Sequence, residues 1–148
     1  MSKYKNKTII FNNITFKSML EKRAFELYTE AGFKPVYEPN KYIIWEKHIL
    51  DNMVNYYKPV KKVMKNNRKV LLPITYTPDF LFTHNGHQII VDTKGRPNET
   101  YPLKLKMFLK YCSLNFKMPV HFFEPHSIRE IKQTIEFINI LPNLKNIK

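Results

Sequence analysis

Two aspartates and a lysine in the middle of the chain have the residue types that metal-dependent hydrolysis needs. Asp79 and Asp92 supply carboxylates, and Lys94 follows Asp92 by two positions, which in a strand places both side chains on the same side. Mg²⁺ prefers oxygen ligands and is often held by one or two carboxylates together with substrate phosphate. Lys94 could orient or deprotonate the attacking water, or stabilise charge on the phosphate. The expected cofactor is therefore Mg²⁺, with Mn²⁺ as a substitute.

A predicted β-hairpin brings the two carboxylates together. Residues 74–82 and 88–92 have the pattern of strands, and the Asn85-Gly86 turn between them favours a tight hairpin. Antiparallel pairing of these strands would place Asp79 near Asp92. Like charges opposite each other destabilise a sheet, and Asp is depleted in strands, so a purely structural role explains the pair poorly. A bound cation would compensate for the repulsion.

The first helix is predicted over about 18–31 and offers a third carboxylate. Ser18 is a good N-cap, apolar residues recur at helical spacing, and Gly32 provides a stop. Glu21 lies three positions after Ser18, where it fits either a capping box or a place in the active site.

The remaining pattern predicts an α/β fold with the order helix, three antiparallel strands, helix, strand, helix. The other elements are a short extended piece over 8–16, a first strand over 35–38 and 42–45 with a kink at Pro39, a helix from about 100 to before Pro119, a short buried strand over 120–123, and a helix from Ser127 to before Pro142. A chain of 148 residues can bury its own core, so we expect a single domain over 1–148.

The net charge of the chain indicates a polyanionic partner. Its 25 Lys and Arg against 12 Asp and Glu give +13, and no amphipathic basic helix favours a membrane surface. A basic segment over about 47–70 is expected to project from the sheet as an arm inserted between the first and second strands, the alternative being a solvated loop. The residues expected to contact DNA are Lys58, Lys61, Lys62, Lys65, Arg68, Lys69, Arg96 and Lys104, of which the last two could equally be surface residues.

The single cysteine and the hydropathy of the chain bear on its location. Cys112 excludes a disulfide within the chain and lies in an apolar helical stretch, which indicates a buried, unreactive thiol. The Lys-rich residues 1–7 are not followed by an apolar signal segment, and no stretch reaches transmembrane length. We therefore expect a cytoplasmic protein without membrane association.

The motifs resemble those of the PD-(D/E)XK nuclease superfamily. Pro78-Asp79 and Asp92-Thr93-Lys94 stand where its signature stands. Together with Gly95 and with Glu21 on the first helix, they resemble phage endonuclease I, a family of Holliday junction resolvases, and related small phage nucleases. The similarity extends over about 14–123.

This resemblance implies a restriction-endonuclease-like core (αβββαβα) and a metal-dependent endodeoxyribonuclease. It implies that Asp79 bridges the metal ions, that Asp92 is a ligand, and that the Thr93 backbone carbonyl completes a site. Lys94 would act on water, and Glu21 would contribute from the first helix. Junction resolution needs two sites, which implies a homodimer acting on branched DNA, in the host cytoplasm if the chain is phage-encoded. The chain departs from that family in having Asp92 where Glu is usual and a longer basic arm.

Three other functions fit the same residues. The chain could be a non-specific or nicking nuclease of phage DNA metabolism, or a nuclease directed at RNA. It could also be a non-enzymatic nucleic-acid-binding protein whose carboxylates are structural. Divalent-metal binding separates the last possibility from the enzymes, and a panel of substrates separates the enzymes from one another.

Overall fold

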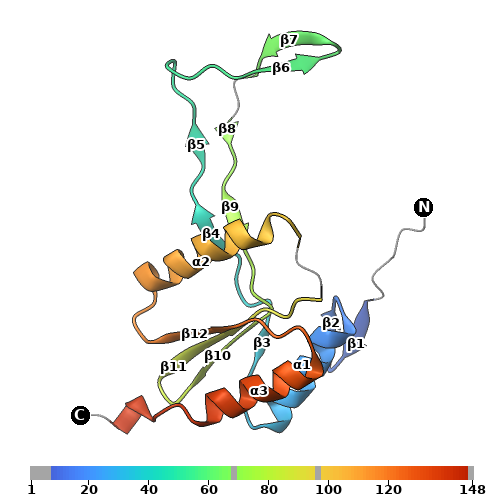
Figure 1. Ribbon diagram of the computed structural model, residues 1–148, viewed down its shortest axis with the longest axis vertical. Coiled ribbons are helices and arrows are strands. Elements are labelled where there is room, and N and C mark those ends of the chain that lie inside the picture. The colour runs from blue at the N-terminus through green and yellow to red at the C-terminus, as the bar shows by residue number, and fades with distance from the viewer. Residues whose placement is uncertain (1–7, 68–69, 96–97, 147–148) are drawn as a thin grey trace.

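The computed structural model describes residues 8–67, 70–95 and 98–146, and it shows a mixed α/β body from which a long two-stranded arm projects (Figure 1). The α/β class is thus confirmed. The body contains β1 (Ile9–Phe11), β2 (Ile14–Phe16), α1 (Met19–Glu30), β3 (Val36–Tyr37), β10 (Phe80–His84), β11 (His87–Val91), α2 (Tyr101–Asn115), β12 (Val120–Phe123), α3 (Ile128–Asn139) and a 3-10 turn over Leu144–Asn146.

A four-stranded sheet forms the centre of the body. Its order is β12-β11-β10-β3; β10 is antiparallel to both β3 and β11, whereas β12 is parallel to β11. Helix α2 lies over one face of this sheet, and α1 and α3 lie over the other (Figure 1). None of the helices in the described parts of the chain is both long enough and apolar enough to cross a membrane.

The core has one layer on each face of the sheet, and β11 contributes to both. Ile89 and Val91 pack into the layer under α1 and α3, whereas Ile90 packs against Phe108 and Cys112 of α2. Side chains alternate along a strand, and a strand covered on both faces is apolar without interruption. The expected burial of the Cys112 thiol is confirmed, and burial raises its pKa to about 11.

Helix α1 begins and ends where its sequence predicts. The Ser18 hydroxyl accepts a hydrogen bond from the Glu21 N–H at 3.1 Å. At the other end, the N–H groups of Gly32 and Phe33 bond the carbonyls of Thr29 and Tyr28, which is a Schellman motif with Gly32 at φ +87°.

Replacing Gly32 with Ala should lower the free energy of unfolding by about 1 kcal/mol, because a Cβ disfavours the left-handed conformation. A Cβ at Gly32 would meet no heavy atom within 4 Å, so the expected loss of stability comes from the backbone conformation and not from a steric clash. Gly95→Ala is the matched control, since its φ lies outside the left-handed region and its Cβ site is equally open. Urea denaturation checks the prediction, and equal losses for both variants would contradict it.

The hairpin expected to carry the carboxylates forms around the predicted turn. Asn85 and Gly86 have φ of +52° and +86°, and the strands pair from His84 opposite His87 to Phe80 opposite Val91. The predicted helices and the strand over 120–123 are also confirmed by α2, α3 and β12. The extended piece over 8–16 is itself a hairpin, turning at Asn12 and Asn13 with positive φ.

Two predicted strands are wrong because each of them is divided between two sheets. Residues 74–82 form β9 (Ile74–Tyr76), which pairs with β4 in the arm, and then β10 in the body. Residues 35–45 likewise form β3 in the body and β4 (Tyr42–Trp45) in the arm, with Glu38 at φ +44° between them. Pro78 and Pro39 lie at these breaks, and a proline cannot donate a ladder hydrogen bond.

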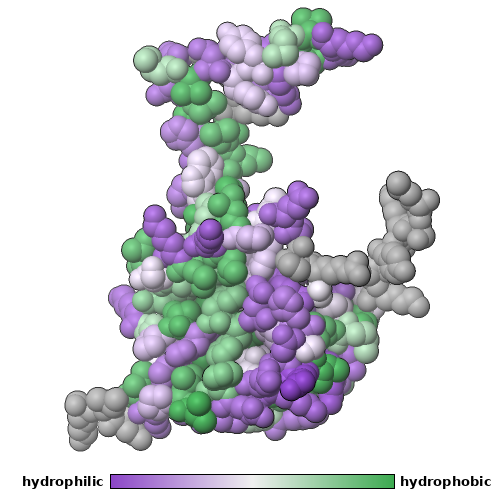
Figure 2. All heavy atoms as spheres, viewed as in Figure 1, coloured by the Kyte–Doolittle hydropathy of each residue, from purple (hydrophilic) through white to green (hydrophobic). Residues whose placement is uncertain are grey.

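The arm consists of three successive two-stranded ladders. Nearest the body, β4 pairs with β9, and beyond them β5 pairs with β8. The β6–β7 hairpin lies across the far end of the arm (Figure 1). The bounds of the outer strands are His48–Ile49 for β5, Tyr57–Val60 for β6, Val63–Asn66 for β7 and Val70–Leu71 for β8. Apolar residues follow the stem of the arm (Figure 2), and among them Ile49 and Leu72 are well exposed.

Candidate active site

Asp79 lies in a buried position immediately before β10. Its Oδ2 accepts two hydrogen bonds from Thr93, one from the backbone N–H and one from the hydroxyl, both at 2.7 Å. The register of β10 and β11 makes Asp79 and Asp92 the next opposed positions after Phe80 and Val91. Burial, and after it the charge of Asp92, raise the pKa of Asp79 to about 8, although the Thr93 hydrogen bonds act in the opposite direction.

Asp92 is the most deeply buried carboxylate of the site, with a residue exposure of 1%. Its Oδ2 accepts a hydrogen bond from the Tyr76 hydroxyl. Its Oδ1 lies 3.0 Å from Lys94 Nζ as an ion pair, yet it makes no hydrogen bond of good geometry with any described residue. A buried carboxylate oxygen without a hydrogen bond is costly, and a cation at this oxygen would compensate for the lost solvation.

Lys94 is held beside Asp92 by contacts with its backbone and its side chain. Its N–H donates to the Pro125 carbonyl at 3.1 Å, which fixes the chain just after β11. Its ammonium group lies 4.7 Å from the centre of the Tyr101 ring as a cation–π contact. The Tyr101 hydroxyl donates in turn to Glu124, so the charge of Lys94 sits among two carboxylates and an aromatic face.

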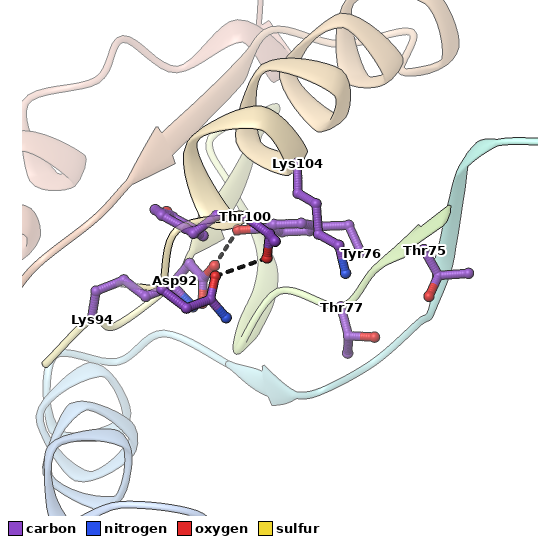
Figure 3. A pocket seen from close by; sticks show the side chains of 9 residues that line it. Thr75, Tyr76, Thr77, Asp92, Lys94, Thr100 and Lys104 are labelled. Carbon is purple, nitrogen blue, oxygen red and sulfur yellow. Dashed lines mark hydrogen bonds and ion pairs between the residues drawn. The ribbon is translucent and has the colours of Figure 1, made fainter. Parts of the chain in front are cut away.

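A cavity of about 240 Å³ opens beside Asp92 and Lys94 (Figure 3), whereas Asp79 is not among its lining residues. Lys104 points into it from the first turns of α2, and Thr75 and Thr77 lie on the side of the arm. The cavity thus combines a carboxylate, two lysines and several hydroxyls at the base of the arm. Its lining residues are Thr75, Tyr76, Thr77, Asp92, Lys94, Asn98, Thr100, Tyr101 and Lys104.

Glu21 is buried on α1, near Asp79 but outside the lining of this cavity. Its Oε2 accepts hydrogen bonds from the Tyr37 hydroxyl at 2.5 Å and from the Lys17 N–H at 3.1 Å. The Ser18 N–H is not the donor, so the reciprocal half of a capping box is absent from the described contacts. The charge of Glu21 contributes to the raised pKa of Asp79, which places the two carboxylates within electrostatic reach of each other.

The residues present fit a divalent ion held by two carboxylates rather than a closed protein cage. Among the described residues, no three His, Cys, Asp or Glu side chains are grouped to hold a metal ion. Mg²⁺ does not need such a group, because it keeps several waters and takes phosphate oxygens as ligands. The Oδ1 of Asp92, which has the Lys94 ion pair but no hydrogen bond, and the cost of ionising the buried Asp79 are the features that a divalent cation would relieve. Thr93 contacts Asp79 through its N–H and hydroxyl, and a role for its carbonyl stays a prediction.

The residues expected to contact DNA fall in two separate places. Lys104 lines the cavity. Lys58, Lys61, Lys62 and Lys65 belong to the β6–β7 hairpin at the far end of the arm. The remaining expected contacts, Arg68, Lys69 and Arg96, lie outside the described residues.

Tyr76 and Tyr101 are parts of the site that the sequence did not identify as such. Tyr76 lies in the core, where its ring stacks on Phe108 at 4.4 Å between centroids. Its hydroxyl, however, binds Asp92. Burial raises the pKa of both tyrosines, and the carboxylates that accept from them raise it further. Only the separation of β9 from β10 lets Tyr76 turn back onto Asp92, and no local pattern signals this.

Replacing Tyr76 with Phe should lower the free energy of unfolding by about 2 kcal/mol, because a buried carboxylate then loses its hydrogen-bond donor while the ring stacking remains. Tyr111→Phe is the matched control, since that ring also packs on Phe108. Chemical denaturation measures both variants. An unchanged stability of Tyr76→Phe would show that the hydrogen bond to Asp92 contributes nothing.

A family model described as "Protein of unknown function (DUF1064)" matches residues 1–123. The matched residues include α1, the arm, and both strands that carry the carboxylate pair. No curated protein and no solved structure gives a significant match to the chain.

Proposed function

The chain belongs to the DUF1064 family of proteins of unknown function, and we propose that it is a Mg²⁺-dependent endonuclease that hydrolyses DNA phosphodiester bonds. The observation that carries the proposal is the pair of buried carboxylates Asp79 and Asp92, at the positions just beyond Phe80 and Val91 in the register of β10 and β11, with Lys94 at 3.0 Å from Asp92. Two buried carboxylates this close together can both be ionised only at a high cost unless a cation joins them.

Each residue of the site has a distinct proposed role. Asp79 and Asp92 would hold Mg²⁺, Mn²⁺ being a substitute, and Glu21 would contribute a further carboxylate from α1. When bound, Mg²⁺ would acidify the attacking water and neutralise charge on the phosphate. Lys94 would orient that water and stabilise the negative charge that develops on the phosphate oxygens. Lys104 would hold a phosphate of the substrate in the cavity.

The order of elements supports a restriction-endonuclease-like core. Helix α1, the antiparallel strands β3, β10 and β11, helix α2, the parallel strand β12 and helix α3 follow one another as the resemblance to PD-(D/E)XK nucleases implies. Within that superfamily, we propose a phage-type nuclease that resolves branched DNA as a homodimer. A nicking or degradative nuclease is the closest alternative.

A cleavage assay with linear, nicked and four-way-junction DNA, each with and without Mg²⁺, tests the proposal. Metal-dependent cleavage of DNA supports it, and preferential cleavage of the junction in two opposed strands supports resolution. The same assay with an RNA substrate tests the alternative that the protein is a nuclease directed at RNA. If no substrate is cut with Mg²⁺ or Mn²⁺, the proposal fails.

A non-enzymatic nucleic-acid-binding protein is the second candidate, and the arm favours it. Four described lysines lie on the β6–β7 hairpin, at the opposite end of the arm from the carboxylates, so they can bind a polyanion without any catalysis. Calorimetric titration with Mg²⁺ or Mn²⁺ separates the two functions. A non-enzymatic binding protein should show no metal-binding site that Asp92→Asn removes, whereas the enzyme should show one.

A further inference from the structure

The β6–β7 hairpin is a regular ribbon whose pairing extends beyond its strands. Four residue pairs form it, from Tyr57 opposite Asn66 to Val60 opposite Val63. It is prolonged by the Asn67 N–H, which donates to the Tyr56 carbonyl, and by a side-chain hydrogen bond between Asn66 and Asn55 at 3.1 Å. The distal end of the arm therefore presents a defined surface.

The charges of this ribbon are arranged for a polyanion. Lys58 is the direct cross-strand partner of Lys65, and Lys61 and Lys62 form the turn. Like charges opposite each other destabilise a ribbon unless a counter-charge binds to them. The sequence supplies little of it nearby, since residues 47–78 include seven Lys and Arg and a single acid, Asp51.

The turn of the ribbon has a backbone conformation that is unfavourable for the two residues that form it. Lys61 and Lys62 have φ of +50° and +66°, a conformation that Asn and Gly adopt far more readily than a residue with a long side chain. Two lysines at this turn place two ammonium groups at the extreme tip of the ribbon. A structural role alone would favour Asn-Gly, so the choice of residue indicates contact with a ligand.

The two faces of the ribbon differ in character. Because cross-strand partners share a face, Lys58 and Lys65 lie on one side together with Val60 and Val63. Tyr57, Pro59, Met64 and Asn66 lie on the other side, which carries no charge. Tyr57 and Met64 are exposed by 55% and 62%. The major groove of B-DNA, about 12 Å wide, admits a two-stranded β-ribbon without deformation, whereas the minor groove, about 6 Å wide, has to be widened to take one. Lysines would reach the flanking phosphates, and the apolar side chains would contact base edges.

The stem of the arm sets the distance between the ribbon and the cavity. Thr75 lines the cavity and pairs with Ile43 in β4, while the outer ladder of the stem ends at Ile49 opposite Val70. At roughly 3.3 Å per residue, this stem spans about 20 Å. The same length corresponds to about six base pairs of duplex at 3.4 Å per step.

We propose that the β6–β7 ribbon binds in the major groove of double-stranded DNA about six base pairs from the phosphate in the Asp79–Asp92 site. The location of that phosphate rests on the proposed function; the binding of duplex by the ribbon does not. The partner is thus duplex DNA that continues beyond the point of cleavage.

Binding of the full-length protein to labelled duplex, measured by fluorescence anisotropy without divalent metal, tests the ribbon. Replacing Lys58, Lys61, Lys62 and Lys65 together with Ala should weaken binding roughly tenfold to a hundredfold at low salt, and should lower the salt-dependence slope by about three to four. The matched control removes four exposed lysines of the body, Lys34, Lys117, Lys132 and Lys145, and should change binding much less. Equal losses in the two variants would overturn the proposal.

A second variant removes charge from the ribbon without disturbing the fold of the hairpin. Lys61→Asn with Lys62→Gly installs the residues preferred in this turn, so it should leave the hairpin intact or more stable while removing two charges. Its affinity for duplex should fall roughly threefold to tenfold. An affinity equal to that of the wild type contradicts the proposal, as does tighter binding of the wild type to single-stranded DNA or to anionic lipid vesicles than to duplex.

Experiments with duplexes of different length show whether the ribbon proposal or the proposed nuclease function is the one that fails. The wild type should lose affinity when the duplex is shortened to fewer than about six base pairs on one side of the cleaved position, and the four-Ala ribbon variant should not. If no cleavage is found but the ribbon variants still lose duplex binding, only the proposed function fails. If long duplex is cut and bound equally by the ribbon variant and the control, only the ribbon proposal fails.

Discussion

Asp79→Asn and Lys94→Ala should each reduce the rate of DNA cleavage by about a thousandfold or more, while binding of duplex DNA is retained. Asn keeps an oxygen that can accept both Thr93 hydrogen bonds but removes the negative charge that would hold the cation. Ala removes the ammonium group that lies beside Asp92. Binding should persist because the lysines of the arm are untouched.

Single-turnover cleavage with Mg²⁺, together with anisotropy binding of the same substrate, measures both halves of this result. Glu136→Gln and Lys132→Ala are matched controls, because they remove the same charges from exposed positions of α3. Both controls should cleave at the wild-type rate. Cleavage by Asp79→Asn or Lys94→Ala at the wild-type rate would refute the assignment, whereas loss of binding as well as cleavage would point to misfolding.

The second large effect expected is a dependence of stability and metal affinity on pH, with Asp79 as its source. Burial and the charge of Asp92 raise the pKa of Asp79 to about 8 in the folded protein. Between the unfolded pKa near 4 and this value, the folded state holds a proton that the unfolded state has released. The contribution of Asp79 to stability is therefore complete below about pH 4 and is lost as the pH rises toward 8.

Without metal, the wild type should accordingly lose roughly 3 to 4 kcal/mol of stability more than Asp79→Asn does between about pH 5 and pH 8. Mg²⁺ needs the ionised carboxylate, so its affinity should rise by up to tenfold per pH unit below about pH 8, with release of a proton on binding. Urea denaturation at both pH values with and without Mg²⁺, and calorimetry in buffers of different ionisation enthalpy, measure these effects. Identical pH profiles for the wild type and Asp79→Asn would contradict the prediction.

The opposed carboxylates were predictable because local signals determine their register. The Asn85-Gly86 turn fixes which residues of the hairpin face each other, and counting outward from it leads to Asp79 and Asp92. The same locality explains why α1 begins after Ser18 and ends before Gly32. Caps and tight turns act over a few residues, so a sequence pattern is sufficient to find them.

The contacts around the two carboxylates depend on pairing between distant segments, and the sequence pattern did not predict them. Tyr76 reaches Asp92 only because β9 lies outside the body sheet and pairs with β4, about thirty positions earlier in the chain. Which strand pairs with which is decided by packing of the whole core against α2, including the stacking of Tyr76 on Phe108.

The sequence by itself therefore determined the α/β class, the helices, the central hairpin and, through its turn, the juxtaposition of two acidic groups with a nearby amine. Tertiary structure alone decided how deeply those groups are buried, which hydroxyls hold them, and how far the basic hairpin lies from them. The physical reason is range: hydrogen bonds of turns and caps are satisfied within a few residues, whereas desolvation and strand partnership depend on chain segments that meet only after folding.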